Sequence, residues 1–332
     1  MLAQVLPHLE ALVSYDTRNP PRAITTGGIF DYLRAQLPDF VVEVSDHGAG
    51  AVSLFAVRGQ PKQVFNVHLD TVPSSPAWTA DPLKLRVTDD RAIGLGACDI
   101  KGAAAALIAA AQSTHGDAAF LFTSDEEAND PRCIAAFLAR EHGFAEAIIA
   151  EPTQGQAILA HRGISAVRML FKGQAGHASA ENALALSAVH NAMRWGTTAL
   201  DYVQGQHHLR FGFRPLPSQN MDALHTQFRE FAAVEALAEY EETFRGPSLP
   251  SGDVARAEER RLAARDLADE LGLPIGNAVD FWTEASLFSA AGLTALVYGP
   301  GDIAQAHTAD EWVSLEQLQR YAETVQRIFG QN

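Results

Sequence analysis

The sequence predicts an α/β fold in which helices cover a mainly parallel β-sheet, with a smaller α+β domain inserted into it. Short runs of apolar residues recur, and each run ends abruptly in polar residues that can do chemistry. Segments with a helical pattern separate these runs. Runs that are apolar on both faces are typical of parallel strands buried beneath helices, and such sheets bind ligands beyond the carboxyl ends of their strands.

The predicted strands of the large domain end next to residues of functional type. The strands are expected at residues 64–67, 119–123, 147–150 and 294–298. His68 follows the first strand, residues 124–127 follow the second, and Glu151 follows the third. Because the carboxyl ends of parallel strands meet at one edge of a sheet, we expect these strand ends to converge on one crevice. The alanine-rich run at 102–111 predicts a buried helix, since it is far shorter than the roughly 20 residues of a membrane span.

The inserted domain begins where the pattern changes at about residue 164. Val167, Met169 and Phe171 alternate with Arg168 and Lys172, which predicts a half-exposed strand. The further elements expected there are a long helix at about 183–204, a strand at 209–213 and a helix at about 221–233. A breaker-rich stretch at 247–252 and a charged helix at 254–271 then lead back to the large domain. The predicted limits are residues 1–163 with 247–332 for the large, discontinuous domain, and 164–246 for the inserted one.

The composition describes an ordinary globular protein with an excess of acid. Hydrophobic residues make up 47% and charged residues 20%, which argues against disorder. The formal net charge of −15 argues against a nucleic-acid partner, because binding to a phosphate backbone needs clustered lysine and arginine. Cys98 and Cys133 are too few for a disulfide framework and fit a reducing compartment. With no export signal and no membrane span in the sequence, we expect a cytoplasmic location.

The first candidate functional residues lie at a strand end and before the alanine-rich helix. His68-Leu69-Asp70 places an imidazole and a carboxylate on the same side of a strand, two residues apart. A carboxylate there can orient a metal-binding imidazole by accepting its other N–H, although a His-x-Asp sequence is also common in surface turns. Asp99 follows a glycine-marked loop. It either caps the helix or bridges two cations through its two oxygens.

Four further residues complete a set of oxygen and nitrogen donors. Glu126 and Glu127 come in succession at a strand end, so their side chains point in different directions, and one can bind a metal while the other moves protons. Glu151 adds a carboxylate, and His307 adds an imidazole on a loop that starts with glycines. Each of these residues alone is ordinary. Together, imidazoles and carboxylates without thiolates suit Zn²⁺, Co²⁺ or Mn²⁺.

Motifs along nearly the whole chain resemble those of a known family. They are, in order, His68-Leu69-Asp70-Thr71, Gly96-Ala97-Cys98-Asp99-Ile100-Lys101-Gly102, Ser124-Asp125-Glu126-Glu127, Glu151-Pro152-Thr153, Gly176-His177-Ala178-Ser179, and Gly299-Pro300-Gly301 with His307. In this order and spacing the chain resembles the co-catalytic metallo-amidohydrolases, a family that includes acetylornithine deacetylase, succinyl-diaminopimelate desuccinylase and glutamate carboxypeptidase. Thr283-Glu284-Ala285 and the sequence around Arg214 and His307 look like the acetylornithine deacetylase branch, and within it like N-acetylcitrulline deacetylases.

The resemblance implies a zinc-exopeptidase-like catalytic domain that holds two divalent metal ions per subunit, Zn or Co. His68 and Glu151 would hold one ion, and Glu127 and His307 would hold the other. Asp99 would bridge the two ions. This assignment chooses between the two roles that the residues alone leave open for Asp99.

The resemblance also implies roles for the residues around the metals. Asp70 would orient His68. Glu126 would take a proton from the attacking water and return it to the departing amine. His177, on the inserted domain, would reach the active site of the neighbouring subunit and stabilise the oxyanion. The inserted domain would thus be the dimerisation and lid domain of a homodimer.

Three residues are expected to bind the substrate. Arg214 resembles the family arginine that grips the α-carboxylate, a task suited to a planar, bidentate donor. Arg162 is a weaker candidate for the same region, and Thr283 belongs to the branch-specific motif. The implied reaction is metal-dependent hydrolysis of the N-acyl amide of a small amino acid, in particular deacetylation of N-acetylcitrulline or N-acetylornithine in arginine biosynthesis.

Two alternatives remain open at this point. The chain is either an aminopeptidase, dipeptidase or desuccinylase of the same family, or a non-catalytic relative that binds a ligand or a partner. The intact Glu126 and the intact ligand candidates count against a non-catalytic relative. We recognise no site for a free amino terminus in the sequence, which favours an acyl amino acid over a dipeptide as substrate.

One departure from the family lies between the long helix and the strand at 209–213. Family members carry an additional strand, loop and strand there, with an asparagine that helps to bind substrate, and this sequence lacks them near residues 204–209. Loss of a strand would leave backbone groups of the inserted sheet unpaired, which a stable domain seldom tolerates. We therefore expect a missing stretch rather than a true deletion, with two consecutively numbered Cα atoms much farther apart than about 3.8 Å.

Overall fold

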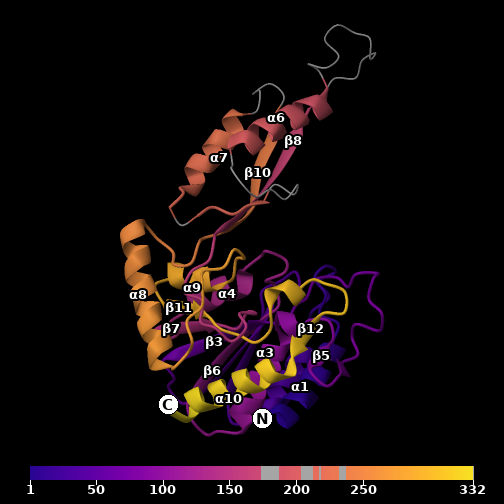
Figure 1. Ribbon diagram of the computed structural model, residues 1–332, viewed down its shortest axis with the longest axis vertical. Helices are drawn as coiled ribbons and strands as arrows, with labels where there is room; N and C mark the ends of the chain where they lie inside the picture. The colour runs from indigo at the N-terminus through magenta and orange to yellow at the C-terminus, as the bar shows by residue number, and fades with distance from the viewer. Residues whose placement is uncertain (173–186, 203–211, 217, 232–236, 332) are drawn as a thin grey trace. The chain divides into compact units, whose positions relative to one another are not determined.

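The computed structural model describes residues 1–331 apart from 173–186, 203–211, 217 and 232–236 (Figure 1). The chain forms two compact units. The larger unit consists of Met1–His161, Pro250–Val279 and Thr283–Asn332, and the smaller of Arg162–Leu249 and Asp280–Trp282. The domain limits predicted after residue 163 and before residue 247 lie close to these borders, but the segment Asp280–Trp282 was expected in the larger domain.

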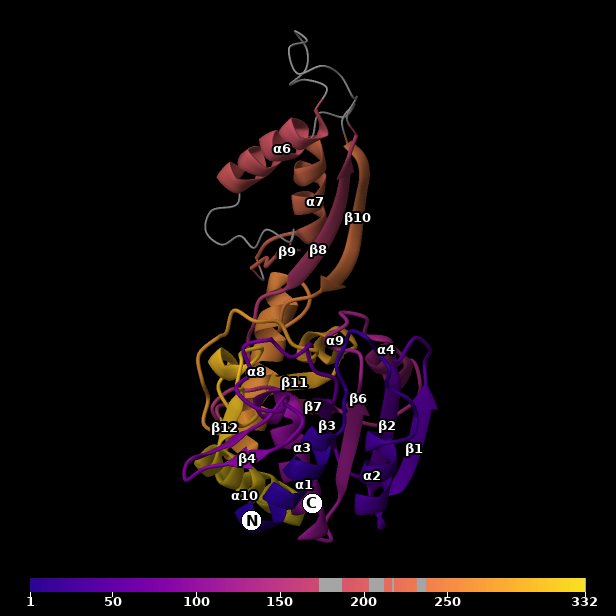
Figure 2. The same cartoon turned by 90° about the vertical axis from the view of Figure 1, so that its right-hand side faces the viewer.

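The larger unit is built on a six-stranded sheet with the order β1-β2-β6-β3-β7-β11. The strands are β1 (Val41–Asp46), β2 (Val52–Arg58), β3 (Gln63–His68), β6 (Ala118–Thr123), β7 (Glu146–Ile149) and β11 (Thr294–Val297). β6, β3, β7 and β11 pair in parallel, and β2 and β1 extend this group by antiparallel pairing (Figure 2). The four parallel strands are those predicted from their apolar runs, and the predicted fold class is confirmed.

Helices cover both faces of this sheet. Phe120 and Ala56 are paired across β6 and β2, so they point to one face, and Phe55 points to the other. The Phe329 ring of α10 (Leu315–Gln331) packs on Phe120, with ring centroids 5.6 Å apart. The Phe137 ring of α4 (Arg132–Leu138) packs on Phe55 from the opposite side, at 5.6 Å. Buried strands between two helical layers explain why their sequences are apolar on both faces.

The α10 side of the sheet also holds the helix predicted from the alanine-rich run. α3 (Gly102–Gln112) packs against α10 and against α1 (Leu2–Ser14), and its residues 102–111 are all buried. The other helical elements of the larger unit are α2 (Ile29–Gln36), η1 (Ala97–Lys101), α8 (Val254–Glu270), α9 (Ala285–Ala290) and η2 (Ile303–Gln305). Within the described part of the chain, every helix is too short or too polar to span a membrane.

A small antiparallel sheet lies beside the main one in the larger unit. Its strands are β4 (Arg86–Val87), β5 (Arg91–Ile93) and β12 (Trp312–Ser314), in the order β12-β5-β4. β12 pairs with β5. This pairing brings the segment before α10 next to the segment that leads into η1, although the two are more than two hundred residues apart in the sequence.

The smaller unit contains a three-stranded antiparallel sheet with the order β10-β8-β9. Its described elements are β8 (Ile164–Phe171), α6 (Ala188–Tyr202), β9 (Gly212–Phe213), α7 (Met221–Glu230) and β10 (Leu237–Gly246). The described part of the strand predicted at 209–213, β9, lies at one end of this sheet order, and β8 lies between β9 and β10. The missing stretch expected at 204–209 lies outside the described residues.

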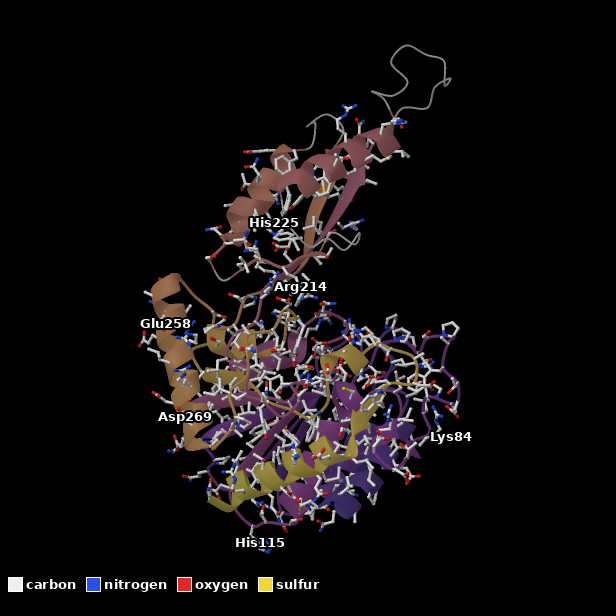
Figure 3. The ribbon with its side chains drawn as sticks, viewed as in Figure 1. Lys84, His115, Arg214, His225, Glu258 and Asp269 are labelled. Carbon is white, nitrogen blue, oxygen red and sulfur yellow. The ribbon has the colours of Figure 1, made fainter. Side chains whose placement is uncertain are left out.

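A partly buried polar network joins α7, β8 and β10 of the smaller unit. His225 of α7 places Nδ1 2.6 Å from the Tyr240 hydroxyl and Nε2 2.8 Å from a carboxylate oxygen of Glu242, both on β10. Ser165 of β8 donates to the same Glu242 oxygen over 2.9 Å. Figure 3 labels His225 within this unit. The network fixes the helix to the sheet and accounts for a histidine that has no functional motif around it.

Candidate metal centre

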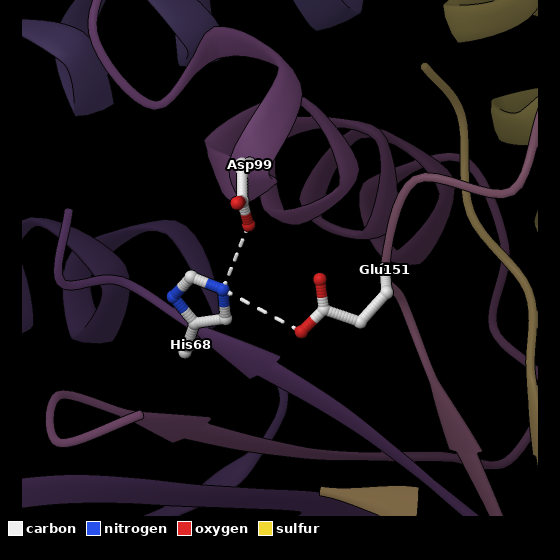
Figure 4. A group of neighbouring side chains, drawn as sticks. All are labelled: His68, Asp99 and Glu151. Atoms are coloured by element: carbon white, nitrogen blue, oxygen red, sulfur yellow. Dashed lines mark hydrogen bonds and ion pairs between the residues drawn. The ribbon is translucent and has the colours of Figure 1, made fainter. Parts of the chain in front are cut away.

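The first group of candidate ligands forms where β3 and β7 end. His68 is the last residue of β3, Glu151 follows β7, and Asp99 lies in η1 just before α3. The His68 Nε2 atom is 2.9 Å from Asp99 Oδ1 and 3.5 Å from Glu151 Oε1 (Figure 4). All three residues are buried. Neighbouring parallel strands thus bring together residues that are far apart in the sequence, as their strand ends predicted.

The second group shares Asp99 with the first. The His307 Nε2 atom lies 3.3 Å from Asp99 Oδ2 and 3.0 Å from Glu127 Oε1. Each oxygen of Asp99 therefore faces a different imidazole. Asp99 does not cap α3, whose first turn receives no side-chain hydrogen bond. This is the geometry expected of a carboxylate shared between two cation sites.

The two groups fit divalent metal ions. In each group, one ligand atom from every residue lies within 4.8 Å of the others, close enough to surround a single ion. The donors are imidazole nitrogens and carboxylate oxygens, which suit Zn²⁺, Co²⁺ or Mn²⁺. Cys98 does not join them, because its thiol donates to the Asp302 carbonyl over 3.3 Å and burial raises its pKa. The structure thus supports the predicted set of oxygen and nitrogen donors without a thiolate.

The electrostatics of the metal-free centre favour the binding of positive charge. Burial, with the nearby charge of Asp99, raises the pKa of Glu151 to about 8, and burial also raises the pKa of Glu127 and Glu126. Hydrogen bonds to Asp99 and Glu127 raise the pKa of His307 to about 11. Burial opposes ionisation of Asp99, but its bonds to His307 and His68 outweigh this and lower its pKa. The protons held by His307, Glu127 and Glu151 thus supply positive charge that bound cations would otherwise supply.

The Nδ1 side of the His68 ring faces Asp70. Its Nδ1 atom lies 3.0 Å from the main-chain oxygen of Asp70, whereas the nearest carboxylate oxygen of Asp70 is 3.6 Å away. The Asp70 carboxylate instead accepts hydrogen bonds from the Asn19 side chain over 2.9 Å and from the Glu127 backbone N–H over 3.0 Å. Asp70 therefore links the segment of His68 to the segment of Glu127. Asn19 could not be predicted from the sequence, because a lone asparagine in a proline-rich loop carries no recognisable pattern.

Close backbone packing holds the strand ends at the centre. Gly299 follows β11, and a Cβ atom added there would lie 2.5 Å from the carbonyl oxygens of Ala150 and Glu151. Only glycine allows this approach without displacing one of the segments. The glycine-marked loop predicted before His307 thus has a steric reason in the chain next to Glu151.

Thr283 lies buried in the larger unit. Its hydroxyl is 3.1 Å from His161 Nε2 and accepts the Ala285 backbone N–H over 3.2 Å. The adjoining Glu284 is also buried, one of its oxygens has no hydrogen-bond partner, and burial raises its pKa well above the ordinary value. The nearby charge of Asp125 adds to this rise. Glu284 is thus a buried acid, for which the sequence predicted no role beyond its place in the Thr283-Glu284-Ala285 motif.

The other predicted substrate-binding residues belong to the smaller unit. Arg162 pairs through Nε with an oxygen of Asp280 over 2.8 Å. Arg214 follows β9 and is exposed within its unit (Figure 3). His177 lies in the range 173–186, outside the described residues. The roles expected for these three residues stay predictions.

The fold and the ligand groups define a class of protein in which parallel strands of an α/β sheet end at a shared centre of carboxylates and histidines. Comparison with known families identifies the family within this class. Peptidase family M20/M25/M40 matches residues 64–331, and the chain belongs to this family. The family resemblance predicted from the motifs is confirmed.

Relatives of known name are found among deacetylases. The N-acetyl-L-citrulline deacetylase of Xanthomonas campestris pv. campestris is 66% identical over 361 residues, which cover 99% of this chain and 98% of the relative. The acetylornithine deacetylase of Myxococcus xanthus is 28% identical and covers 96% of both chains. The stretch aligned with the Xanthomonas protein is longer than this chain, so that relative contains residues with no counterpart here.

Solved structures share the fold at low identity. Aminopeptidase PepT of Bacillus cereus has a TM-score of 0.72 and 18% identity, with 99% of this chain and 98% of that chain covered. The YXEP protein of Bacillus subtilis, a dinuclear metal binding peptidase of the M20 family, has a TM-score of 0.65 and 14% identity, with the same coverage. At this identity the likeness concerns the fold alone.

We predict that removal of divalent cations lowers the melting temperature, and that the loss grows as the pH rises from about 5 to about 8. In the metal-free protein Glu151 has a pKa of about 8 against an ordinary 4.5, so between these values the folded state binds a proton that the unfolded state has lost. His307, at about 11 against 6.5, acts in the same direction at higher pH. Stability of the metal-free form therefore falls as the pH rises.

Metal ions would replace these protons, so the loaded form should lose less stability over the same range. Differential scanning calorimetry of the loaded and metal-free protein at several pH values checks this. A difference in melting temperature between the loaded and the metal-free protein that stays constant or shrinks with rising pH would contradict the electrostatic explanation of the centre.

Proposed function

We propose that this chain is a metal-dependent deacetylase that hydrolyses the N-acetyl amide of N-acetylcitrulline or N-acetylornithine in arginine biosynthesis. The observation that carries the proposal is the carboxylate of Asp99, which faces two histidine-containing ligand groups at once. The 66% identity to an N-acetyl-L-citrulline deacetylase over nearly both chains supports the reaction and the substrate class. The acetylornithine deacetylases among the relatives support the same chemistry.

The ligand groups would hold two divalent ions, Zn or Co. His68 and Glu151 would bind one ion, Glu127 and His307 the other, and Asp99 both. When bound, such ions polarise the acyl carbonyl and make water a stronger nucleophile at neutral pH. The dinuclear metal binding of the Bacillus subtilis peptidase, which shares the fold, supports the number of ions.

Glu126 would move the proton. It lies in the turn after β6, next to Glu127, and belongs to neither ligand group. Burial raises its pKa well above the ordinary value of a glutamate, and the charges of Glu127 and Glu151 add to this rise. Its carboxylate would accept a proton from the attacking water as the water oxygen bonds to the acyl carbon. It would then donate that proton to the amine nitrogen as the C–N bond breaks, which releases acetate and the free amino acid.

The remaining assignments complete the proposal. Arg214 and Arg162 would bind the substrate carboxylate, since a guanidinium matches a carboxylate in a bidentate pair. Thr283 would line the substrate site. His177 would stabilise the oxyanion in the active site of the partner subunit, which requires a homodimer. Sedimentation of the purified protein tests whether it is a dimer. A cytoplasmic location fits the two free, buried cysteines.

A hydrolysis assay tests the substrate class. The full chain, loaded with Co²⁺ or Zn²⁺, is assayed with N-acetylcitrulline, N-acetylornithine, N-acetylglutamate, N-succinyl-diaminopimelate and a dipeptide. We predict release of acetate from N-acetylcitrulline or N-acetylornithine with a kcat/KM at least about tenfold above the other three, because the branch-specific motifs favour these substrates. Faster cleavage of the dipeptide or of the succinyl substrate would replace the proposal with the corresponding relative's activity.

Glu126→Gln separates proton transfer from metal binding. We predict that the variant keeps its metal content but loses about 10²–10⁴-fold in kcat, the usual contribution of a general acid–base group. Metal analysis beside initial rates measures both quantities. Glu323→Gln, a change at an exposed residue of α10, serves as the control and should keep its metal content and its kcat. A glutamine variant at position 126 with a near-native rate would remove Glu126 from the mechanism.

A further inference from the structure

Glu311 binds the backbone of the segment that carries Asp99. Its Oε2 atom accepts the Gly96 N–H over 3.0 Å, and its Oε1 atom accepts the N–H groups of Cys98 and Asp99, each over 2.9 Å. The residue is 2% exposed, and its own carbonyl oxygen accepts the Gly94 N–H over 3.0 Å. One buried carboxylate thus satisfies three backbone donors beside the shared ligand.

These donors need a partner because the segment is irregular. Gly96 has a φ of 77°, in the left-handed region, and Asp99 has non-helical φ and ψ angles of −121° and 87°. The N–H groups of such a segment cannot all bond within a regular helix, and buried N–H groups without a partner are costly. A carboxylate is the strongest acceptor available for several N–H groups at once. Glu311 therefore fixes a backbone shape that the segment would not hold by itself.

Glu311 also lies on the segment that carries His307. It follows His307 by four residues and directly precedes β12, which pairs with β5. β5 ends at Ile93, just before the glycine-marked segment of Asp99. The carboxylate therefore joins the backbone of one ligand of the second group to the backbone of the ligand that both groups share.

We propose that Glu311 is a positioning residue of the metal centre, which keeps the two oxygens of Asp99 aimed at the two ligand groups. The proposal rests on the metal-dependent function proposed above. His68 and Glu151 are held at the ends of paired strands, whereas Glu127 and His307 lie on connecting segments. Loss of Glu311 should thus weaken the Glu127–His307 site more than the His68–Glu151 site.

Glu311→Gln tests this role because it keeps the shape of the side chain and changes its bonding. The amide oxygen can accept from one side, but the amide nitrogen is a donor and would face at least one of the three N–H groups. The Glu127–His307 site should hold the more weakly bound Co²⁺ ion, because both residues lie on connecting segments. We expect this ion to lose about 10–100-fold in affinity, the usual effect of removing a residue that supports metal ligands. The more tightly bound ion should change less.

The measurement is competition between a chromophoric chelator and the Co²⁺-loaded full chain, followed by the visible absorption of bound Co²⁺. Glu316→Gln, a change of an exposed acid five residues further on, is the matched control and should bind both ions like the wild type. If Glu311→Gln is not recovered folded by circular dichroism, Glu311→Asp replaces it. The aspartate keeps the charge but is one methylene too short to reach all three N–H groups, so an intermediate loss is expected.

The outcomes separate this proposal from the proposed function. A wild-type protein that binds two Co²⁺ ions, with unchanged affinities for both in folded Glu311→Gln or Glu311→Asp, would show that Glu311 does not position the metal ligands. A wild-type protein that binds no divalent ion would overturn the proposed function, and the role of Glu311 with it. If the variant loses affinity only for the more weakly bound ion, and Glu316→Gln binds both ions like the wild type, the result supports the positioning role.

Discussion

The centre depends on one electrostatic constraint: several carboxylates are buried together and need positive charge between them. Burial disfavours the charged forms of Glu126, Glu127 and Glu151, and their pKa values are raised accordingly. In the polypeptide the compensating charge is supplied by His68 and His307, each facing one oxygen of Asp99. The same spacing that pairs these acids and imidazoles allows both groups to hold cations.

The architecture meets this constraint with two kinds of support. Paired parallel strands carry His68 and lead directly to Glu151, so the backbone hydrogen bonds of the sheet set the distance between these residues. Asp99 lies on an irregular segment, which needs bonds from outside it. The Asp70 carboxylate ties the Glu127 backbone to Asn19, and the Glu311 carboxylate ties the Asp99 backbone to the segment of His307. Acids that are not ligands thus hold the segments that carry ligands.

The sequence predicted the parts of the fold that arise from local patterns. The four parallel strands follow from apolar runs, and the parallel pairing of β3 with β7 brings His68 and Glu151 together. Asp70 shows the limit, because its main-chain oxygen rather than its carboxylate lies nearest to Nδ1 of His68. Glu311 could not be foreseen, since its partners are backbone N–H groups more than two hundred residues away. β10 was missed because Glu242, which contacts His225 from the same face of the strand as Tyr240, interrupts the apolar alternation of a strand.

Anomalous diffraction from crystals of the zinc-loaded protein tests the shared metal centre most directly. We expect two zinc peaks, one beside His68 and Glu151 and the other beside Glu127 and His307, with one oxygen of Asp99 within about 2.0–2.2 Å of each. A single peak without contact to Asp99, or peaks away from both ligand groups, would contradict the shared centre.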